Sequence, residues 1–318
     1  MKEYRDVRAR FSFLELCKNP DVAAEVTVTA VEKLGVDAAI IFADILLVLE
    51  PLGAGLEFTK GDGPVLHNPV RSPEDLQRLA PGDSSEAVPF VYDAVRKAKA
   101  ALKVPLIGFS GAPFTLASYL IEGGGSRNYV HTKKLMYGAP QAWHSLMGRL
   151  SCIVVGYLNR QIAAGADAVQ IFDSWVGCLS PEDYREYVLP HMRGLIAAIT
   201  PGTPVIHFGT DTGELLELIR DAGGSVVGLD WRTPLDKGWQ RLGHHVGVQG
   251  NLDPVALFGP LPEIRRRTTS ILAAAGGRPG HIFNLGHGIL PNTPVDSVRA
   301  LVEMVHEMSQ RPQGEARS

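Results

Sequence analysis

Seven short apolar segments recur along the chain, and each is followed by a longer stretch with helical spacing. Each segment is an almost unbroken run of apolar residues with little polar alternation, which is typical of parallel strands buried on both faces. Strand–helix alternation of this kind occurs in α/β barrels and in doubly wound open sheets. The pattern predicts strands within Ala38–Leu49, Val104–Gly111, Ala168–Trp175, Pro204–Gly209, Ser225–Trp231, Val246–Gly250 and His281–Gly286.

Apolar residues at helical spacing fill most of the intervening stretches. They predict helices over Ala142–Ala164, Pro181–Ile199, Glu214–Ala222 and Pro262–Ala275, and a last helix with Thr293 as N-cap and Pro294 as its first residue.

One connection is unusually long and runs from Leu49 to Ser72, the predicted N-cap of a helix that begins at Pro73. Within it, GLEFTKGDGPVL predicts a hairpin that turns at Lys60–Gly63. A long insertion on the catalytic side of a barrel is a lid or substrate wall about as often as a structural flap.

Polar residues follow the apolar segments at the same end, which favours a barrel over an open sheet. In a barrel these ends converge on one mouth, whereas an open sheet binds its ligand at a single switch point, usually with a glycine-rich fingerprint. The only glycine cluster, EGGGS at 122–126, has the wrong spacing for that fingerprint. We therefore expect one barrel domain over residues 1–318, with a disordered tail at 311–318. The polar residues are Asp44, Ser110, Ser174, His207, Asp230, Asn251 and His287.

Charge and composition exclude several classes of partner. The formal net charge of −3 leaves no basic excess for nucleic acid. The longest apolar run, Ala38–Leu49, is too short to span a membrane and contains Asp44. The charged N-terminus lacks the apolar stretch of a secretory signal. Three scattered cysteines without a CxxC pair indicate a reducing cytoplasm and argue against disulfides or a cysteine zinc site.

Asp44 is the candidate that carries the most chemical information. A carboxylate within an apolar strand is costly to bury unless it is paired or hydrogen-bonded. It could cap a backbone turn at the strand end, or it could point into the mouth and stabilise a developing cation.

Three other residues at strand ends are candidates for the same site. Tyr119 follows a sharp Gly-Ala-Pro turn, and either lines the site or packs against the barrel. Ser174 either binds a substrate oxygen or caps a turn, and strand alternation turns its neighbour Asp173 to the opposite face. His287 lies between two glycines that let the backbone approach a ligand closely, which favours a functional role.

The chain resembles the uroporphyrinogen decarboxylase family through a series of segments that occur in the family's order along almost the whole chain. These are YRDVRARFSFLELCKNPDVAAEVT (4–27), DAAIIFADILLV (37–48), GFSGAPFTLASYLIEGGGS (108–126), QIFDSWVG (170–177), VVGLDW (226–231), VQGNLDP (248–254) and NLGHGILP (284–291). The resemblance implies a single (β/α)8 barrel, usually a homodimer. It also implies decarboxylation of the four acetate side chains of uroporphyrinogen III to coproporphyrinogen III, without a metal or organic cofactor.

The resemblance also assigns roles to single residues. Asp44 matches the family's essential aspartate, Tyr119 its active-site tyrosine and His287 its C-terminal histidine. Three further matches concern substrate binding: Ser174 as a binding hydroxyl, Arg8 as an arginine facing the site, and Phe109 as an apolar residue lining the cleft.

The chain departs from the family pattern at its beginning. The family has an RQAGRY-type motif, whose arginines bind substrate carboxylates, immediately before the segment that matches MKEYR. Met1 falls just after that position. Seven predicted strands, where a closed barrel needs eight, agree with this departure. We therefore expect the first barrel strand to be missing from an N-terminally incomplete chain, with impaired activity.

Two alternatives remain beside the decarboxylase. One is a related corrinoid methyltransferase, which needs a His-x-Cys zinc motif that His207-Phe208-Gly209 lacks. The other is a relative that binds tetrapyrroles without catalysis.

Overall fold

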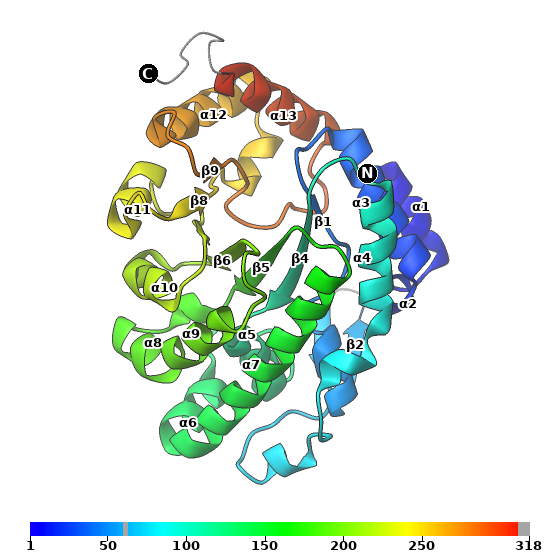
Figure 1. Cartoon of the computed structure of the whole chain (residues 1–318), viewed down its shortest axis with the longest axis vertical. Coiled ribbons are helices and arrows are strands. Elements are labelled where there is room, and N and C mark those ends of the chain that lie inside the picture. Colours follow the sequence, from blue (N-terminus) through cyan, green and yellow to red (C-terminus); the bar gives the residue numbers. More distant parts are fainter. Residues whose placement is uncertain (60–62, 311–318) are drawn as a thin grey trace.

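The computed structural model describes residues 1–59 and 63–310, and its centre is a curled sheet of seven parallel strands (Figure 1). The strands follow one another round the sheet in chain order, so each new strand pairs with the one before it. They are β1 (Ala39–Ile40), β4 (Leu106–Gly111), β5 (Ala168–Asp173), β6 (Val205–Gly209), β7 (Val226–Gly228), β8 (Gly247–Gln249) and β9 (His281–Ile282).

The sheet has two edges, β1 and β9, which pair only with β4 and β8 respectively among the described residues. Ile40 on β1 and Ile282 on β9 are each 44% exposed, as expected for strands with a neighbour on one side only. Within residues 1–59 and 63–310 the sheet holds the seven predicted strands, which fits a (β/α)8 fold with one strand missing. The predicted fold class is confirmed.

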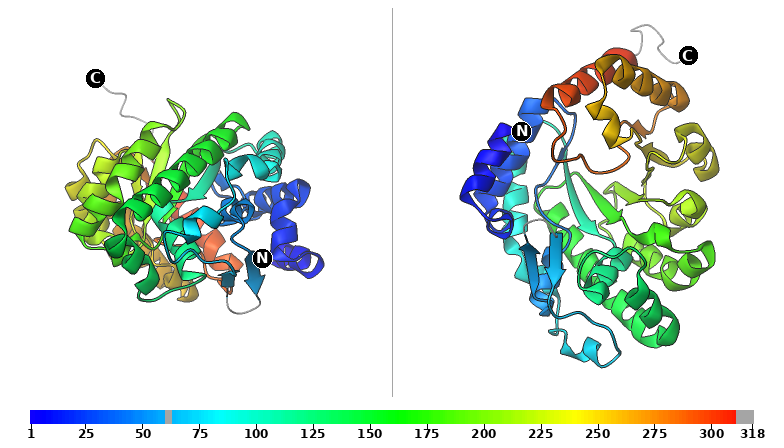
Figure 2. Two further views of the ribbon diagram at one scale, coloured as in Figure 1. Left: turned by 90° about the horizontal axis from the view of Figure 1, so that it is seen from below. Right: turned by 180° about the vertical axis from the view of Figure 1, so that it is seen from behind.

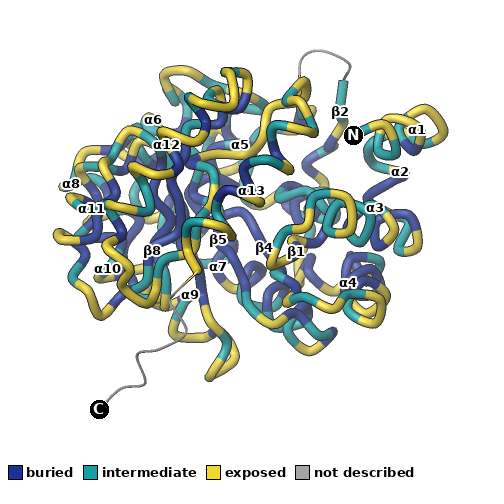
Figure 3. The backbone as a smooth tube through the Cα atoms, turned by 90° about the horizontal axis from the view of Figure 1, so that it is seen from above, coloured by how far each residue is buried: buried dark blue, intermediate teal, exposed yellow. Residues whose placement is uncertain are grey.

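Helices surround the sheet, and most of them combine buried positions with exposed ones, whereas β4, β5 and β6 are buried almost throughout (Figure 3). Ahead of β4 the chain forms α1 (Lys2–Arg10), α2 (Phe13–Lys18), α3 (Pro20–Leu34) and α4 (Pro89–Ala101). After β4 it forms α5 (Pro113–Glu122), α6 (Val130–Gly138), α7 (Pro140–Ala163), α8 (Pro181–Tyr187), α9 (Leu189–Ala197), α10 (Leu216–Ala222), α11 (Leu235–Leu242), α12 (Leu261–Ala275) and α13 (Val295–Ser309).

The predicted helices agree with the structure except at particular breaks. Pro181–Ile199 forms two helices because Pro190 has no N–H group for a helical hydrogen bond, and the chain turns at Val188. The stretch Glu214–Ala222 begins with the 3-10 turn η5 (Gly213–Leu215). The last helix starts one residue later than predicted, with Pro294 as N-cap, while Thr293 donates its hydroxyl hydrogen bond to the Leu290 carbonyl.

The prediction of a strand over Ala38–Leu49 is wrong beyond Ile40. The Phe42 N–H donates to the Thr27 hydroxyl (2.9 Å), and the Leu46 N–H donates to the Asp44 carboxylate (2.8 Å). These side-chain acceptors hold the chain in a turn that leads into the 3-10 helix η1 (Leu47–Leu52). Asp44 therefore follows the strand.

The long connection contains the predicted hairpin, formed by antiparallel β2 (Leu56–Thr59) and β3 (Gly63–Leu66) outside the main sheet (Figure 2). Residues 60–62 of its predicted turn lie outside the described residues, as does the tail 311–318 predicted to be disordered. The helix predicted from Pro73 is wrong. The Ser72 hydroxyl caps only the start of the short turn η2 (Asp75–Arg78), a second short turn η3 (Ser84–Ala87) follows, and α4 starts at Pro89.

Candidate active site

Alternation along β4, β5 and β6 divides their residues between the barrel interior and the helical layer. Phe109, Phe172 and Phe208 face the interior in a row of edge contacts, with ring centroids 5.5 and 6.0 Å apart. Deeper in the interior, the Gln249 amide donates to the Gln170 amide oxygen (3.3 Å). Aromatic side chains therefore line the interior near the carboxyl ends of the strands, and the Gln170–Gln249 pair lies deeper.

Asp44 lies half-buried in the loop after β1. Its Oδ1 accepts the Leu46 N–H, so the turn-capping interpretation holds for that oxygen. Its Oδ2 accepts no hydrogen bond from residues 1–59 or 63–310. Burial raises the pKa of Asp44 to about 6, and the Leu46 hydrogen bond opposes that rise. At pH 7 the carboxylate is mostly ionised.

Tyr119 lies on α5, which begins directly after β4. Its ring stacks on Trp175 with centroids 3.7 Å apart and planes 27° apart. Burial raises the pKa of Tyr119 to about 12, and the negative charge of Asp44 adds to the rise. The phenol is therefore neutral at physiological pH and lies within electrostatic reach of Asp44.

Ser174 and Trp175 follow the last residue of β5. Ser174 is half-buried, and its hydroxyl makes no hydrogen bond with the part of the chain that is described. Trp175 contacts the rings of both Tyr119 and Tyr129, and its contact with Tyr129 is T-shaped with centroids 5.4 Å apart. We refer to Tyr119, Tyr129 and Trp175 as the aromatic wall.

His287 lies in the exposed loop after β9. Its ring makes edge contacts with Phe208 (6.5 Å) and with Trp231 (6.3 Å), which follows β7. The Arg232 guanidinium lies 4.1 Å from the centroid of the Trp231 ring. Ring contacts through Phe208 and Phe172 therefore link His287 to Phe109 in the barrel interior.

Arg8 lies at the edge of this arrangement, on α1. Its guanidinium donates to the Phe11 carbonyl (2.7 Å) and lies 5.6 Å from the centroid of the Phe13 ring, which packs against Phe42 near Asp44. No ion pair joins Arg8 to Asp44 among the described residues. Burial raises the pKa of Cys17, the negative charge of Asp44 adds to the rise and the positive charge of Arg8 opposes it, so both charged groups lie near that thiol.

His207 and Asp173 face away from the interior. His207 is fully buried, both of its ring nitrogens lack a partner in the described part of the chain, and burial lowers its pKa to about 4. Asp173 is fully buried beside α5 and accepts a hydrogen bond from the Thr115 hydroxyl (2.8 Å). His207 thus lies near the carboxyl end of β6, but its side chain points into the helical layer and not into the barrel interior.

The chain matches the family model described as "Uroporphyrinogen decarboxylase (URO-D)" over residues 1–308. It is 57% identical to the uroporphyrinogen decarboxylase of Carboxydothermus hydrogenoformans over 312 residues, which are 97% of this chain and 89% of the relative. It is 56% identical to that of Sorangium cellulosum over 311 residues, with the same coverage of both chains. The chain belongs to the uroporphyrinogen decarboxylase family.

Two solved structures share the fold with this member of the uroporphyrinogen decarboxylase family. A methyltransferase from Methanosarcina mazei has a TM-score of 0.81 and 22% identity, over 93% of this chain and 88% of that one. A putative vitamin-B12 independent methionine synthase from Listeria monocytogenes has a TM-score of 0.63 and 12% identity, over 98% and 95%. At these identities the likeness concerns the fold alone.

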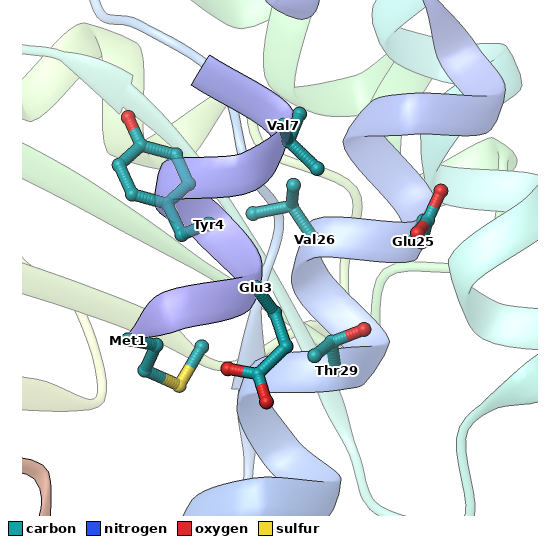
Figure 4. A pocket seen from close by; sticks show the side chains of 7 residues that line it. All are labelled: Met1, Glu3, Tyr4, Val7, Glu25, Val26 and Thr29. Carbon is teal, nitrogen blue, oxygen red and sulfur yellow. The ribbon is translucent and has the colours of Figure 1, made fainter. Parts of the chain in front are cut away.

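Two of the hollows in the described surface of this uroporphyrinogen decarboxylase family member lie between pairs of helices. One is a small hollow between α1 and α3, where Val7 and Val26 point toward each other (Figure 4). The other, about 340 Å³, lies between α11 and α12 and includes Trp231 in its lining. Residues 1–59 and 63–310 contain no group of three or more His, Cys, Asp or Glu side chains placed to hold a metal ion. None of their helices is long and apolar enough to cross a membrane.

Sequence reasoning missed the aromatic groups that connect the candidate residues: Trp175, Trp231, Phe172 and Phe208. A signal was present for each, because all four lie at the carboxyl end of a predicted strand. Ring contacts between different strands cannot be derived from strand ends alone, and the search for titratable and hydroxyl groups passed over the rings.

Proposed function

We propose that this chain is a carboxy-lyase that converts uroporphyrinogen III to coproporphyrinogen III in haem biosynthesis. It removes the carboxyl groups of the four acetate side chains and uses no cofactor. The observation that carries the proposal is 57% identity to a curated uroporphyrinogen decarboxylase over 97% of the chain. The geometry adds support, because the half-buried Asp44 carboxylate follows β1 and lies within electrostatic reach of Tyr119 in the aromatic wall.

The chemistry needs an electron sink, and the substrate itself supplies one. Protonation of a pyrrole ring carbon gives a cation. The carbon–carboxyl bond then breaks, its electron pair moves into the cationic ring, and carbon dioxide leaves. The exocyclic methylene that remains takes up a proton from solvent to become the methyl group, and the ring carbon loses the proton that it gained. A fixed carboxylate beside the pyrrole N–H groups stabilises the cation as it forms. Asp44 takes this role, since its pKa of about 6 keeps it ionised at pH 7 and its Oδ2 is free of the Leu46 hydrogen bond.

The other site residues bind and orient the tetrapyrrole. Phe109 contributes to the apolar floor against which the macrocycle packs, and the Ser174 hydroxyl donates to a substrate oxygen. Tyr119 and His287 hydrogen-bond substrate carboxylates, and Arg8 forms an ion pair with one. In this account Asp44 acts on the pyrrole nitrogens while the surrounding groups hold the acidic side chains.

The assembly and location of the protein follow the family resemblance. The chain acts in the cytoplasm as a homodimer on a small-molecule substrate, with no nucleic acid or membrane partner. The formal net charge of −3 agrees with the absence of a polyanionic polymer partner.

The test is anaerobic incubation of the purified protein with uroporphyrinogen III in the presence of EDTA, followed by oxidation and chromatographic separation of the porphyrins. We expect porphyrins with seven, six, five and finally four carboxyl groups, with matching release of carbon dioxide. Tight porphyrin binding without carbon dioxide release would instead favour the non-catalytic relative. In a separate assay without EDTA, methyl transfer that needs added zinc and a corrinoid would favour the methyltransferase.

A further inference from the structure

A hydrogen-bonded connection behind the mouth links β5 to α5. The Thr115 hydroxyl, on the first turn of α5, donates to Asp173 Oδ1 (2.8 Å). The same oxygen atom of Thr115 accepts the backbone N–H of Trp175 (3.3 Å). Thr115 and Asp173 are both fully buried. One hydroxyl thus holds the end of the strand and the first residues of the loop after it against the helix.

Both ends of this connection carry residues of the aromatic wall. Tyr119 lies one helical turn after Thr115, so the two side chains share a face of α5. Trp175 lies two residues after Asp173. The Tyr119–Trp175 stack joins the two segments within the aromatic wall, and Tyr119 is within electrostatic reach of Asp44. A shift of α5 against the β5 loop would therefore move the stack relative to Asp44.

The Asp173 carboxyl group is buried in surroundings that do not satisfy both of its oxygens. Its Oδ2 is buried and has no hydrogen-bond partner in the described residues, and the same holds for the hydroxyl of Tyr184 on α8. Burial raises the pKa of Tyr184, and the charge of Asp173 adds to the rise, which places the two groups near each other. Burial raises the pKa of Asp173 to about 7. A buried carboxyl group with one unpartnered oxygen costs stability, and an apolar residue would avoid that cost.

We propose that Thr115 and Asp173 are positioning residues, which fix the Tyr119–Trp175 stack against Asp44 and so set the shape of the substrate site. Neither side chain touches the substrate. Asp173 orients the Thr115 hydroxyl by accepting its hydrogen bond, which leaves the hydroxyl oxygen to accept the Trp175 N–H. The catalytic consequence rests on the proposed function, whereas the position of Trp175 does not.

Three variants test this connection. Thr115→Val keeps the shape of the side chain but removes both hydrogen bonds, and Thr115→Ser restores the hydroxyl. Thr115→Val/Asp173→Asn removes the hydroxyl without leaving an unpartnered carboxylate, so it serves if the single valine variant fails to fold. The matched control is Thr268→Val, because Thr268 is also fully buried on a helix and its hydroxyl donates to the Ile264 carbonyl (2.8 Å).

Two readouts separate positioning from simple stabilisation. The first is steady-state decarboxylation, with kcat and KM measured separately. The second is the fluorescence of Trp175, taken as the difference between each protein and the same protein carrying Trp175→Phe, since the chain has four tryptophans. We expect Thr115→Val to lower kcat/KM at least tenfold and to change the Trp175 signal. Thr115→Ser should retain both within about twofold, and Thr268→Val should change neither.

The inference is wrong if folded Thr115→Val, or the double variant, keeps both the wild-type Trp175 signal and wild-type kinetics. It is also wrong if Thr115→Ser fails to restore them. A wild-type protein without decarboxylase activity would overturn the proposed function alone. The fluorescence comparison would still decide whether Thr115 and Asp173 hold the wall.

Discussion

Tyr119 and Trp175 stack with their ring centroids 3.7 Å apart, although one lies on a helix after β4 and the other in the loop after β5. The stack forms one side of the mouth at which Asp44 lies. An aromatic pair of this kind contributes about 0.5–1.5 kcal/mol beyond the burial of its area. It also offers a flat surface suited to a pyrrole ring, so its loss should be felt in substrate binding.

Removal of the indole should therefore weaken binding more than it slows the chemistry. We expect Trp175→Leu to raise KM about 2- to 10-fold, which corresponds to the stacking energy, while kcat falls by a smaller factor. Trp175→Phe keeps an aromatic ring at this position and is the matched comparison, so its effect on KM should be smaller. Equal KM values for Trp175→Leu and the wild type would contradict a binding role for the aromatic wall.

The free energy of unfolding should depend on pH because the pKa values of two carboxyl groups, Asp173 and Asp44, are raised in the folded protein. Burial raises the pKa of Asp173 to about 7, so between about pH 4 and 7 the folded protein holds a proton that the unfolded chain has lost. The contribution of Asp173 to the free energy of unfolding therefore falls as pH rises through this window, by up to about 1.4 kcal/mol per unit. Asp44, with a pKa of about 6, acts in the same direction.

His207 acts in the opposite direction. Its pKa is lowered to about 4, so its contribution to stability is lost as pH falls from about 6.5 to 4.

To isolate the contribution of Asp173, unfolding by urea can be compared in wild type and Asp173→Asn at several pH values from 4.5 to 7.5. We expect the variant to gain stability relative to wild type as pH rises. A constant difference across the series would show that Asp173 titrates normally.

The two open edges of the sheet should promote self-association. Ile40 and Ile282 are each 44% exposed on strands that have one neighbouring strand in the described part of the chain, and exposed edges of this kind favour pairing with other chains. We expect Ile282→Lys to reduce aggregation at high protein concentration, as followed by light scattering. Val130→Lys, which alters an exposed residue on α6, is the control and should have little effect. If both lysine variants behave alike, the edges are not the source of association.

The amino-acid pattern predicted the central strands well because β4, β5 and β6 are buried on both faces and read as continuous apolar runs. It failed where a side chain replaces a backbone partner. The Thr27 hydroxyl and the Asp44 carboxylate take up backbone N–H groups after β1 and end the strand early. Apolar periodicity carries no information about such contacts. The break before Pro190 has a different cause, the missing proline N–H, which apolar spacing alone does not register.

The candidate site was predictable to the level of strand ends but not of contacts. The chain places Tyr119, Ser174 and His287 after strands, which is enough to predict that they lie at one end of the barrel. The contact that carries the further inference, from Thr115 to Asp173 and Trp175, joins segments far apart in the sequence. It also depends on which face of β5 each residue occupies.

The central claim is that the charge of Asp44 stabilises the cation formed during decarboxylation, and Asp44→Asn tests it most directly. Asparagine keeps an oxygen to accept the Leu46 N–H, so the turn is retained while the charge is lost. The decisive measurement is a single-turnover rate of carbon dioxide release with protein in excess, beside a separate measurement of substrate affinity. We predict a rate roughly 10²–10³ times lower with affinity changed only a few-fold. A near-normal rate in the folded variant would remove Asp44 from the mechanism.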